Sequence, residues 1–128
     1  MNGQTGKEAN GQSWSGSGSD FRNQLIWRKS QDFAEKVAAI IVKLPRDRAA
    51  DVVASQLMRS ASSIAANVAE GDGRFSQPAY RNHLSIARGS AFESESWIDL
   101  LIRRGYVRPE IGDELIAACV EVQKLLTT

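Results

Sequence analysis

The chain has 128 residues, of which 42% are hydrophobic and 24% charged, the composition of one globular domain with its own core. Its net charge of +1 excludes the overall basic field of many nucleic-acid binders, so any such role would need a local patch. The single cysteine, Cys119, excludes an internal disulfide and a zinc site built from cysteines, and it favours a reducing, cytoplasmic location. No apolar run approaches the roughly 20 residues of a membrane span, and no signal-peptide core is evident.

Residues 1–20, "MNGQTGKEANGQSWSGSGSD", are rich in Gly, Ser, Asn and Gln. Such a composition cannot bury enough apolar surface to offset the entropy cost of ordering, so it predicts a flexible tail. Trp14 is its one large aromatic residue, and it would be solvated or docked on a folded surface. We expect the folded domain to comprise residues 21–128.

Two amphipathic helices are predicted in the first half of the domain. Apolar residues recur at helical spacing from Phe21 to Leu44, and Pro45 is expected to end this helix. A second helix is predicted from about residue 47 to 71, with one apolar face. Between its large apolar residues lie mostly Ala and Ser, which would let a neighbouring helix approach closely.

Two further helices are predicted in the second half. Ser76 can cap the third helix, Pro78 suits its first turn, and Gly105 can end it. A short loop leads to the last helix, at about 110–126. Four amphipathic helices with short connections favour antiparallel neighbours, so the sequence predicts an all-α, antiparallel up-down-up-down four-helix bundle.

The second and third helices also carry apolar or small residues outside their main stripes. These are Val52, Ala54, Ala61, Ala65, Phe92 and Trp97. Either the buried stripe is wide, or a second face is buried between subunits.

The stretch "NVAEGDGR", residues 67–74, is predicted to end the second helix. Gly71 is expected to be the C-cap in the left-handed conformation, with Gly73 in the same turn. Glu70 would meet the negative end of the helix dipole, so we expect it to have a cationic partner, Arg74 or Arg81. The glycines form no phosphate loop, because no strand precedes them and no Lys-Ser/Thr follows.

Pairing the second and third helices about a loop centred near Arg74 predicts which residues face each other. Ser60 would lie opposite Gly89, a contact of two small residues. Arg59 would lie near Ser90 and Glu93.

Two stretches, "SQLMRSASSIAANVAEGDGR" and "YRNHLSIARGSAFESES", resemble a known family. With the opening "FRNQLIWRKSQDFAEKV", they are similar to the four-helix-bundle proteins encoded within intervening sequences of bacterial 23S ribosomal RNA genes. The resemblance covers about residues 21–126. The matching motif positions are Asn67, Glu70, Gly71, Arg74, Arg88, Gly89, Ser90, Glu93 and Glu95.

The chain departs from the family pattern at Ala91, Ser94 and Trp97, which bears on how a subunit surface would pack. The resemblance implies a homo-oligomer, typically a ring of five bundles, without known catalytic activity. The accessory proteins of diversity-generating retroelements are similar bundles that form pentamers, bind nucleic acid through basic surfaces and partner a reverse transcriptase. This is an analogy at the level of the fold.

The residues themselves indicate no catalytic site. His83 and Cys119 are predicted to lie far apart, as a surface imidazole and a buried inert thiol. Glu93 and Glu95, two apart on a helix, diverge, and the Glu-x-x-His signature of bundle metal sites is absent. We therefore expect no enzyme activity, no cofactor and no metal.

Two basic clusters are the candidate nucleic-acid-binding residues. They are Arg22, Arg28 and Lys29 in the first helix, and Arg103, Arg104 and Arg108 around the end of the third. In an up-down bundle these clusters do not share an end, although adjacent subunits could gather them. The first hypothesis is an oligomeric scaffold or adaptor that binds RNA, DNA or a nucleic-acid enzyme. The alternative is a protein–protein interaction module with no nucleic-acid contact, in which these charges form a solvated face.

Overall fold

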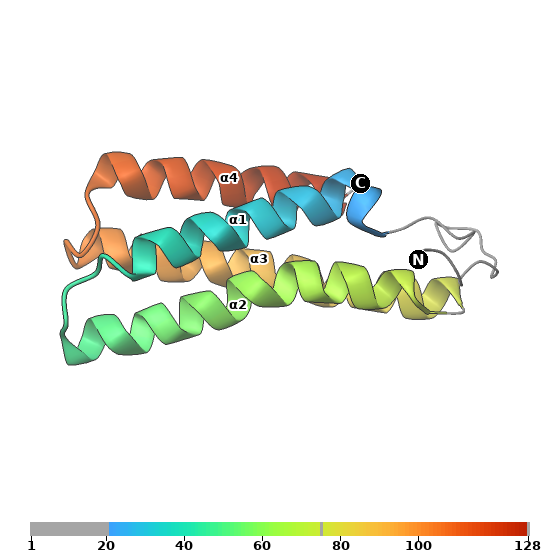
Figure 1. Cartoon of the computed structure of the whole chain (residues 1–128), viewed down its shortest axis with the longest axis horizontal. Coiled ribbons are helices and arrows are strands. Elements are labelled where there is room, and N and C mark those ends of the chain that lie inside the picture. Colours follow the sequence, from blue (N-terminus) through green and yellow to red (C-terminus); the bar gives the residue numbers. More distant parts are fainter. Residues whose placement is uncertain (1–20, 75, 128) are drawn as a thin grey trace.

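A computed structural model describes residues 21–74 and 76–127 (Figure 1). The predicted tail, residues 1–20 with Trp14, lies outside the described residues. A short 3-10 helix, η1 (Phe21–Asn23), precedes four α-helices. These are α1 (Leu25–Ile41), α2 (Arg48–Asp72), α3 (Gln77–Arg103) and α4 (Pro109–Thr127).

The four helices form a bundle in which each helix runs opposite to the one before it (Figure 1). Helix α1 packs on α2, α2 on α3, α3 on α4, and α4 on α1. Among the described residues the backbones of the diagonal pairs α1/α3 and α2/α4 do not approach each other, so the helices stand at the corners of a square. The predicted all-α, up-down-up-down bundle is confirmed.

Side-chain caps fix the starts of α2 and α3. The Asp47 carboxylate accepts hydrogen bonds from the backbone N–H groups of Ala49 and Ala50, at 2.8 and 3.2 Å. Hydrogen bonds from the Ala50 N–H and the Tyr106 hydroxyl lower the pKa of this carboxyl group. The Ser76 hydroxyl accepts from the Ala79 N–H at 3.2 Å, as predicted for an N-cap.

Gly105 ends α3 as the sequence predicts. Its φ of 73° is left-handed. Its N–H bonds to the Ile102 carbonyl, and the Tyr106 N–H bonds to the Leu101 carbonyl, both at 3.0 Å. This is a Schellman motif, which satisfies carbonyls that the helix end would leave unpaired. Helix α1, in contrast, ends at Ile41, before the predicted stop at Pro45.

The core lies along the bundle axis and is contributed by all four helices. Its fully buried large side chains are Phe33, Val37, Leu57, Ile64, Val68, Ile98, Leu101 and Val122. Of the residues outside the predicted stripes, Ala61 and Ala65 are buried inside the chain, so the wide-stripe interpretation holds for them. Val52 and Phe92 are 56% and 47% exposed, so that interpretation does not hold for these two.

Candidate functional site

A chain of hydrogen bonds joins α2, the loop after it, and α3 at the family motif. The Asn67 amide donates to the Ser63 carbonyl at 2.9 Å, and its oxygen lies 3.0 Å from His83 Nδ1. On the other side of the ring, Arg74 Nε donates to His83 Nε2 at 3.2 Å. Arg74 also pairs with Glu70 at 2.5 Å. The motif residues Asn67, Glu70 and Arg74 thus surround the imidazole of His83, a contact that the sequence did not predict.

These bonds define the tautomer of His83. Because Nε2 accepts from the Arg74 guanidinium, the ring proton is on Nδ1, from which it donates to the Asn67 carbonyl oxygen. The His83 side chain is only 13% exposed, so the predicted surface imidazole is wrong. No spacing in the sequence pairs residue 83 with residue 67, because the two residues lie on different helices.

Gly71 is not the predicted left-handed C-cap. Helix α2 continues to Asp72, and its C-cap is Gly73, with a φ of −86°. Among the glycines of the described residues, Gly105 alone has a positive φ. Gly71 is buried within α2, where a Cβ atom would lie 2.9 Å from the Cβ of His83. Its role is therefore to provide space for α3.

Glu70 has the cationic partner that its place at the helix end required. That partner is Arg74, one of the two predicted candidates. Arg81 instead donates to the Gln77 side chain at 3.2 Å.

The predicted register of α2 against α3 is wrong by about one helical turn. Ser60 faces Ser94 rather than Gly89, and the two hydroxyls are 2.8 Å apart. Ser63 meets Ser90 at 3.0 Å. Gly89 is exposed, and a Cβ atom there would have open space. Residues 73–76 join the two helices, so the hairpin is centred beside Arg74 as predicted, and the mismatch grows with distance from the loop, from the Asn67–His83 pair to the Ser60–Ser94 pair.

Arg59 nevertheless forms an ion pair with Glu93, one of its two predicted neighbours. The same Glu93 oxygen accepts from the Trp97 indole N–H at 3.0 Å. Trp97, which departs from the family pattern, therefore contacts a motif residue directly.

The remaining motif residues face α4 or solvent. Glu95 accepts from the Gln123 amide at 2.7 Å. Arg88 lies over the Phe92 ring, 5.3 Å from its centre, and its Nε is 3.4 Å from the Thr127 hydroxyl. Most of the motif side chains thus bond to one another or to neighbouring helices.

No Cys–His pair is present. The Cys119 thiol donates to the Ala91 carbonyl at 3.1 Å and lies against Gln123, whereas His83 bonds to Asn67 and Arg74. Burial raises the pKa of the Cys119 thiol to about 12, so it is protonated and unreactive at neutral pH. Within residues 21–74 and 76–127, no group of three or more His, Cys, Asp or Glu side chains could hold a metal ion.

The two predicted basic clusters lie at opposite ends of the bundle. Arg22, Arg28 and Lys29 are in η1 and the start of α1. Lys29 forms an ion pair with Glu121 at 3.2 Å, and Arg22 lies over the Phe21 ring. Arg103, Arg104 and Arg108 surround the α3–α4 loop. The expectation that these clusters do not share an end is confirmed for a single bundle.

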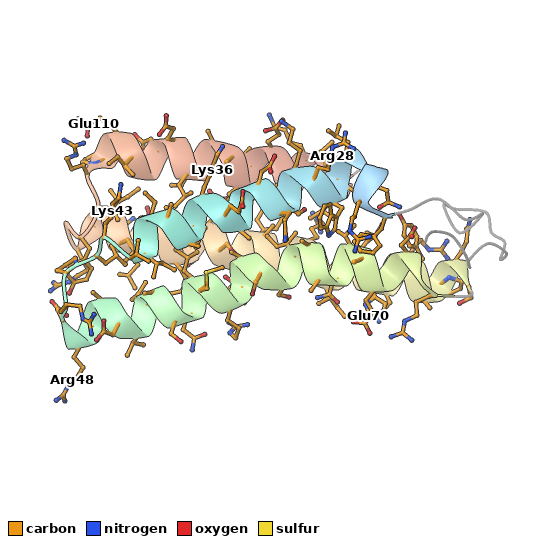
Figure 2. The ribbon with its side chains drawn as sticks, viewed as in Figure 1. Arg28, Lys36, Lys43, Arg48, Glu70 and Glu110 are labelled. Atoms are coloured by element: carbon orange, nitrogen blue, oxygen red, sulfur yellow. The ribbon has the colours of Figure 1, made fainter. Side chains whose placement is uncertain are left out.

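A second basic loop accompanies the α3–α4 loop. The α1–α2 loop lies at the same end of the bundle, and the Tyr106 hydroxyl joins the two by donating to Asp47 at 3.1 Å (Figure 1). In Figure 2, Lys43 and Arg48 lie at this end, whereas Arg28 and Glu70 lie toward the other. We call the combined surface the basic end; it comprises Lys43, Arg46, Arg48, Arg103, Arg104 and Arg108.

Several cations of the basic end are not neutralised by any other residue that the structure describes. Arg103 pairs with Asp99 at 2.7 Å, and Arg104 lies over the Tyr106 ring. Over the described ranges, no ion pair or hydrogen bond holds the side chains of Lys43, Arg46, Arg48 and Arg108. Asp47, Asp51, Asp99 and Glu110 add negative charge at the same end, so the basic end is mixed but has a cationic majority. Lys43, Arg46 and Arg48 were not among the predicted binding residues. The run "KLPRDR", which contains all three, is the sequence feature that could have identified them.

Comparison with known proteins places the chain in a family. The model of the family described as 23S rRNA-intervening sequence protein matches residues 22–128. A crystal structure of a protein of unknown function from the S23 ribosomal protein family of Bacteroides thetaiotaomicron is similar, with 32% sequence identity and a TM-score of 0.75. That match covers 80% of this chain and 94% of the other. No curated protein matches. In the part of the chain that the structure describes, none of the helices is both long and apolar enough to cross a membrane. The chain belongs to the 23S rRNA-intervening sequence protein family.

Proposed function

We propose that this chain is a non-enzymatic, cytoplasmic scaffold or adaptor that binds nucleic acid at its basic end. The observation that carries the proposal is the meeting of two cationic loops at the Asp47–Tyr106 hydrogen bond. Cations without partners among the described residues are available to phosphate groups, and each phosphate contact adds affinity by releasing counterions. A local surface of this kind is compatible with a net charge of +1.

Support for a non-enzymatic role comes from what the motif side chains contact. Asn67, Glu70, Arg74 and His83 bond to one another, and the Cys119 thiol is buried. Their hydrogen-bonding capacity is used in holding helices together.

The second part of the proposal is assembly of copies of this chain, as a pentamer. It rests on the family relationship and on exposed apolar side chains of α2 and α3, namely Val52, Ile86 and Phe92. Light scattering coupled to size-exclusion chromatography tests it. A mass near that of five subunits is expected, and a monomer at micromolar concentration would contradict it.

Fluorescence anisotropy with labelled structured RNA, titrated at several salt concentrations, tests the nucleic-acid role. The expected result is binding that weakens linearly with log salt concentration. Absence of salt-dependent binding at tens of micromolar protein would overturn the proposal. Nucleic acid that co-purifies and is removed by nuclease would support it.

A protein–protein interaction module is the second candidate. The observation that favours it is the exposed apolar surface of α3, where Phe92 is 47% and Ile86 44% exposed. Affinity capture from lysate, with and without nuclease, separates the candidates. Partners that remain after nuclease treatment favour this module, whereas their loss favours the nucleic-acid role.

A further inference from the structure

A hollow of about 340 Å³ lies beside the basic end. It is bounded by the end of α1, the α1–α2 loop and the first turns of α2. Its apolar walls come from Ile41, Leu44, Pro45 and Ala54. This volume is at the small end of the range typical of sites for small ligands, about 300 to 1,000 Å³.

Two polar side chains of opposite charge also line the hollow. Arg46 and Asp51 both form part of its wall. Neither side chain has an ion pair or hydrogen bond with any other described residue. Lys43 and Arg48, likewise unpaired over the same ranges, flank Arg46 in sequence. Figure 2 shows Arg48 at this end of the bundle, pointing outward.

The apolar walls, the carboxylate and the surrounding cations together indicate which kind of ligand the hollow can bind. Apolar walls suit a flat ring, an unpaired carboxylate accepts hydrogen bonds from amino groups, and the surrounding cations attract phosphate. A nucleotide unit carries all three complementary features. A base in a duplex is stacked and paired, so it can enter such a hollow only after being extruded, whereas a base of a single strand is available directly.

We propose that the hollow takes one base of a single-stranded nucleic acid, whose neighbouring phosphates contact Lys43, Arg46 and Arg48. This inference rests on the proposed nucleic-acid role and specifies it. The Asp51 carboxylate favours cytosine over uracil, because cytosine presents an amino group where uracil presents a carbonyl oxygen that the carboxylate repels.

The test measures anisotropy with single-stranded 12-mers of cytidine and of uridine and with a 12-base-pair RNA duplex, at one low salt concentration. Ala54→Phe fills the hollow without changing charge. Ala66→Phe, at an exposed position of the same helix, is the matched control. Ala54→Phe should weaken binding of the cytidine strand about fivefold or more, as expected for the loss of one stacked base, and leave duplex binding unchanged. Ala66→Phe should change neither.

Asp51→Asn provides an independent test, because it alters the hydrogen bonding but not the shape of the hollow. The wild-type preference for cytidine over uridine should disappear in this variant, and that loss would support the inference even if Ala54→Phe failed to fold. Circular dichroism and thermal melting check the fold of each variant.

The possible failures are distinguishable. Wild-type protein that binds no nucleic acid would overturn the proposed function, and the hollow with it. Wild-type protein that binds single strands and duplex equally, or a folded Ala54→Phe variant with unchanged affinity, would overturn the inference about the hollow alone. An unchanged cytidine preference in Asp51→Asn would do the same.

Discussion

His83 packs directly against the backbone of Gly71. A side chain at residue 71 would place its Cβ atom 2.9 Å from the Cβ of His83. Both Cβ positions are fixed by helix backbones, so neither can rotate away. The contact also places the ring between Asn67 and Arg74. The motif glycine thus sets the spacing of α2 and α3 at their shared end.

Gly71→Ala should destabilise the protein by about 1–2 kcal/mol. Overpacking costs about 1–3 kcal/mol, and replacing a helical glycine by alanine returns up to about 1 kcal/mol. Gly89→Ala is the matched control, because Gly89 is an exposed glycine inside α3 with open space around its Cβ position. It should stabilise the protein by about 0.5–1 kcal/mol.

Urea denaturation of both variants measures the free energies of unfolding. Opposite signs for the two substitutions are expected. Two stabilising substitutions would show that α3 has room to move away from residue 71, contrary to the close contact described here.

His83 should be the Nδ1-protonated tautomer whenever it is neutral. The reason is that its Nε2 accepts from Arg74 while its Nδ1 faces the Asn67 oxygen. Long-range ¹H–¹⁵N correlation at pH 8 measures this without ambiguity, since the chain has one histidine. Protonation at Nε2 would contradict the network, as would rapid exchange between the tautomers.

Gly112 and Ile102 should be energetically coupled. A Cβ atom at Gly112 would overlap the side chain of Ile102 at the α3–α4 end of the bundle. After subtraction of the gain from replacing a helical glycine, Gly112→Ala should destabilise the wild-type protein by about 1–2 kcal/mol, and it should be neutral or stabilising in an Ile102→Ala background. A double-mutant cycle of unfolding free energies measures the coupling, and additive effects would contradict the predicted overlap.

Cys119 should resist thiol reagents in the native protein. Its pKa of about 12 leaves almost no thiolate at pH 8, and its side chain is fully buried. A colorimetric disulfide reagent should label it only at the rate of unfolding, and immediately in denaturant. Stoichiometric labelling of native protein within seconds would contradict the burial.

The same thiol gives a pH dependence of stability. Its unfolded pKa is near 9.0 and its folded pKa about 12, so the unfolded chain loses the proton first. Its contribution to stability is complete below pH 9 and declines as pH rises toward 12. From pH 9 to 12, the unfolding free energy of the wild type should therefore fall relative to that of Cys119→Ala. A difference between the two proteins that stays constant with pH would contradict the raised pKa.

Local signals predicted the helices well. Ser76, Pro78 and Gly105 act through their own backbone neighbourhood, and each has the predicted role at an end of α3. The order of packing followed from short connections, because these favour antiparallel neighbours.

Contacts between helices were predicted less well, since they depend on register. A glycine near a helix end can be a left-handed cap or a point of close approach, and the sequence does not distinguish the two at Gly71. The predicted register, which assumed symmetric pairing about the loop, placed Ser60 opposite Gly89 instead of Ser94. Of the basic end, the cations around the α3–α4 loop were predicted and those of the α1–α2 loop were not. Arg46 and Arg108 lie far apart in the chain, and only the folded bundle brings their loops together.

The most direct test of the nucleic-acid role compares two triple variants that remove equal charge. One is Lys43→Gln, Arg46→Gln and Arg108→Gln at the basic end; the other is Arg22→Gln, Arg28→Gln and Lys36→Gln along η1 and α1. The measurement is the slope of log affinity against log salt for single-stranded RNA. Each phosphate contact to a single strand contributes about 0.7 to the steepness of this slope, so removing three contacts should make the slope of the basic-end variant shallower by about 2. The other variant should keep the wild-type slope. An unchanged slope in the basic-end variant, or equal losses in both, would contradict binding at the basic end.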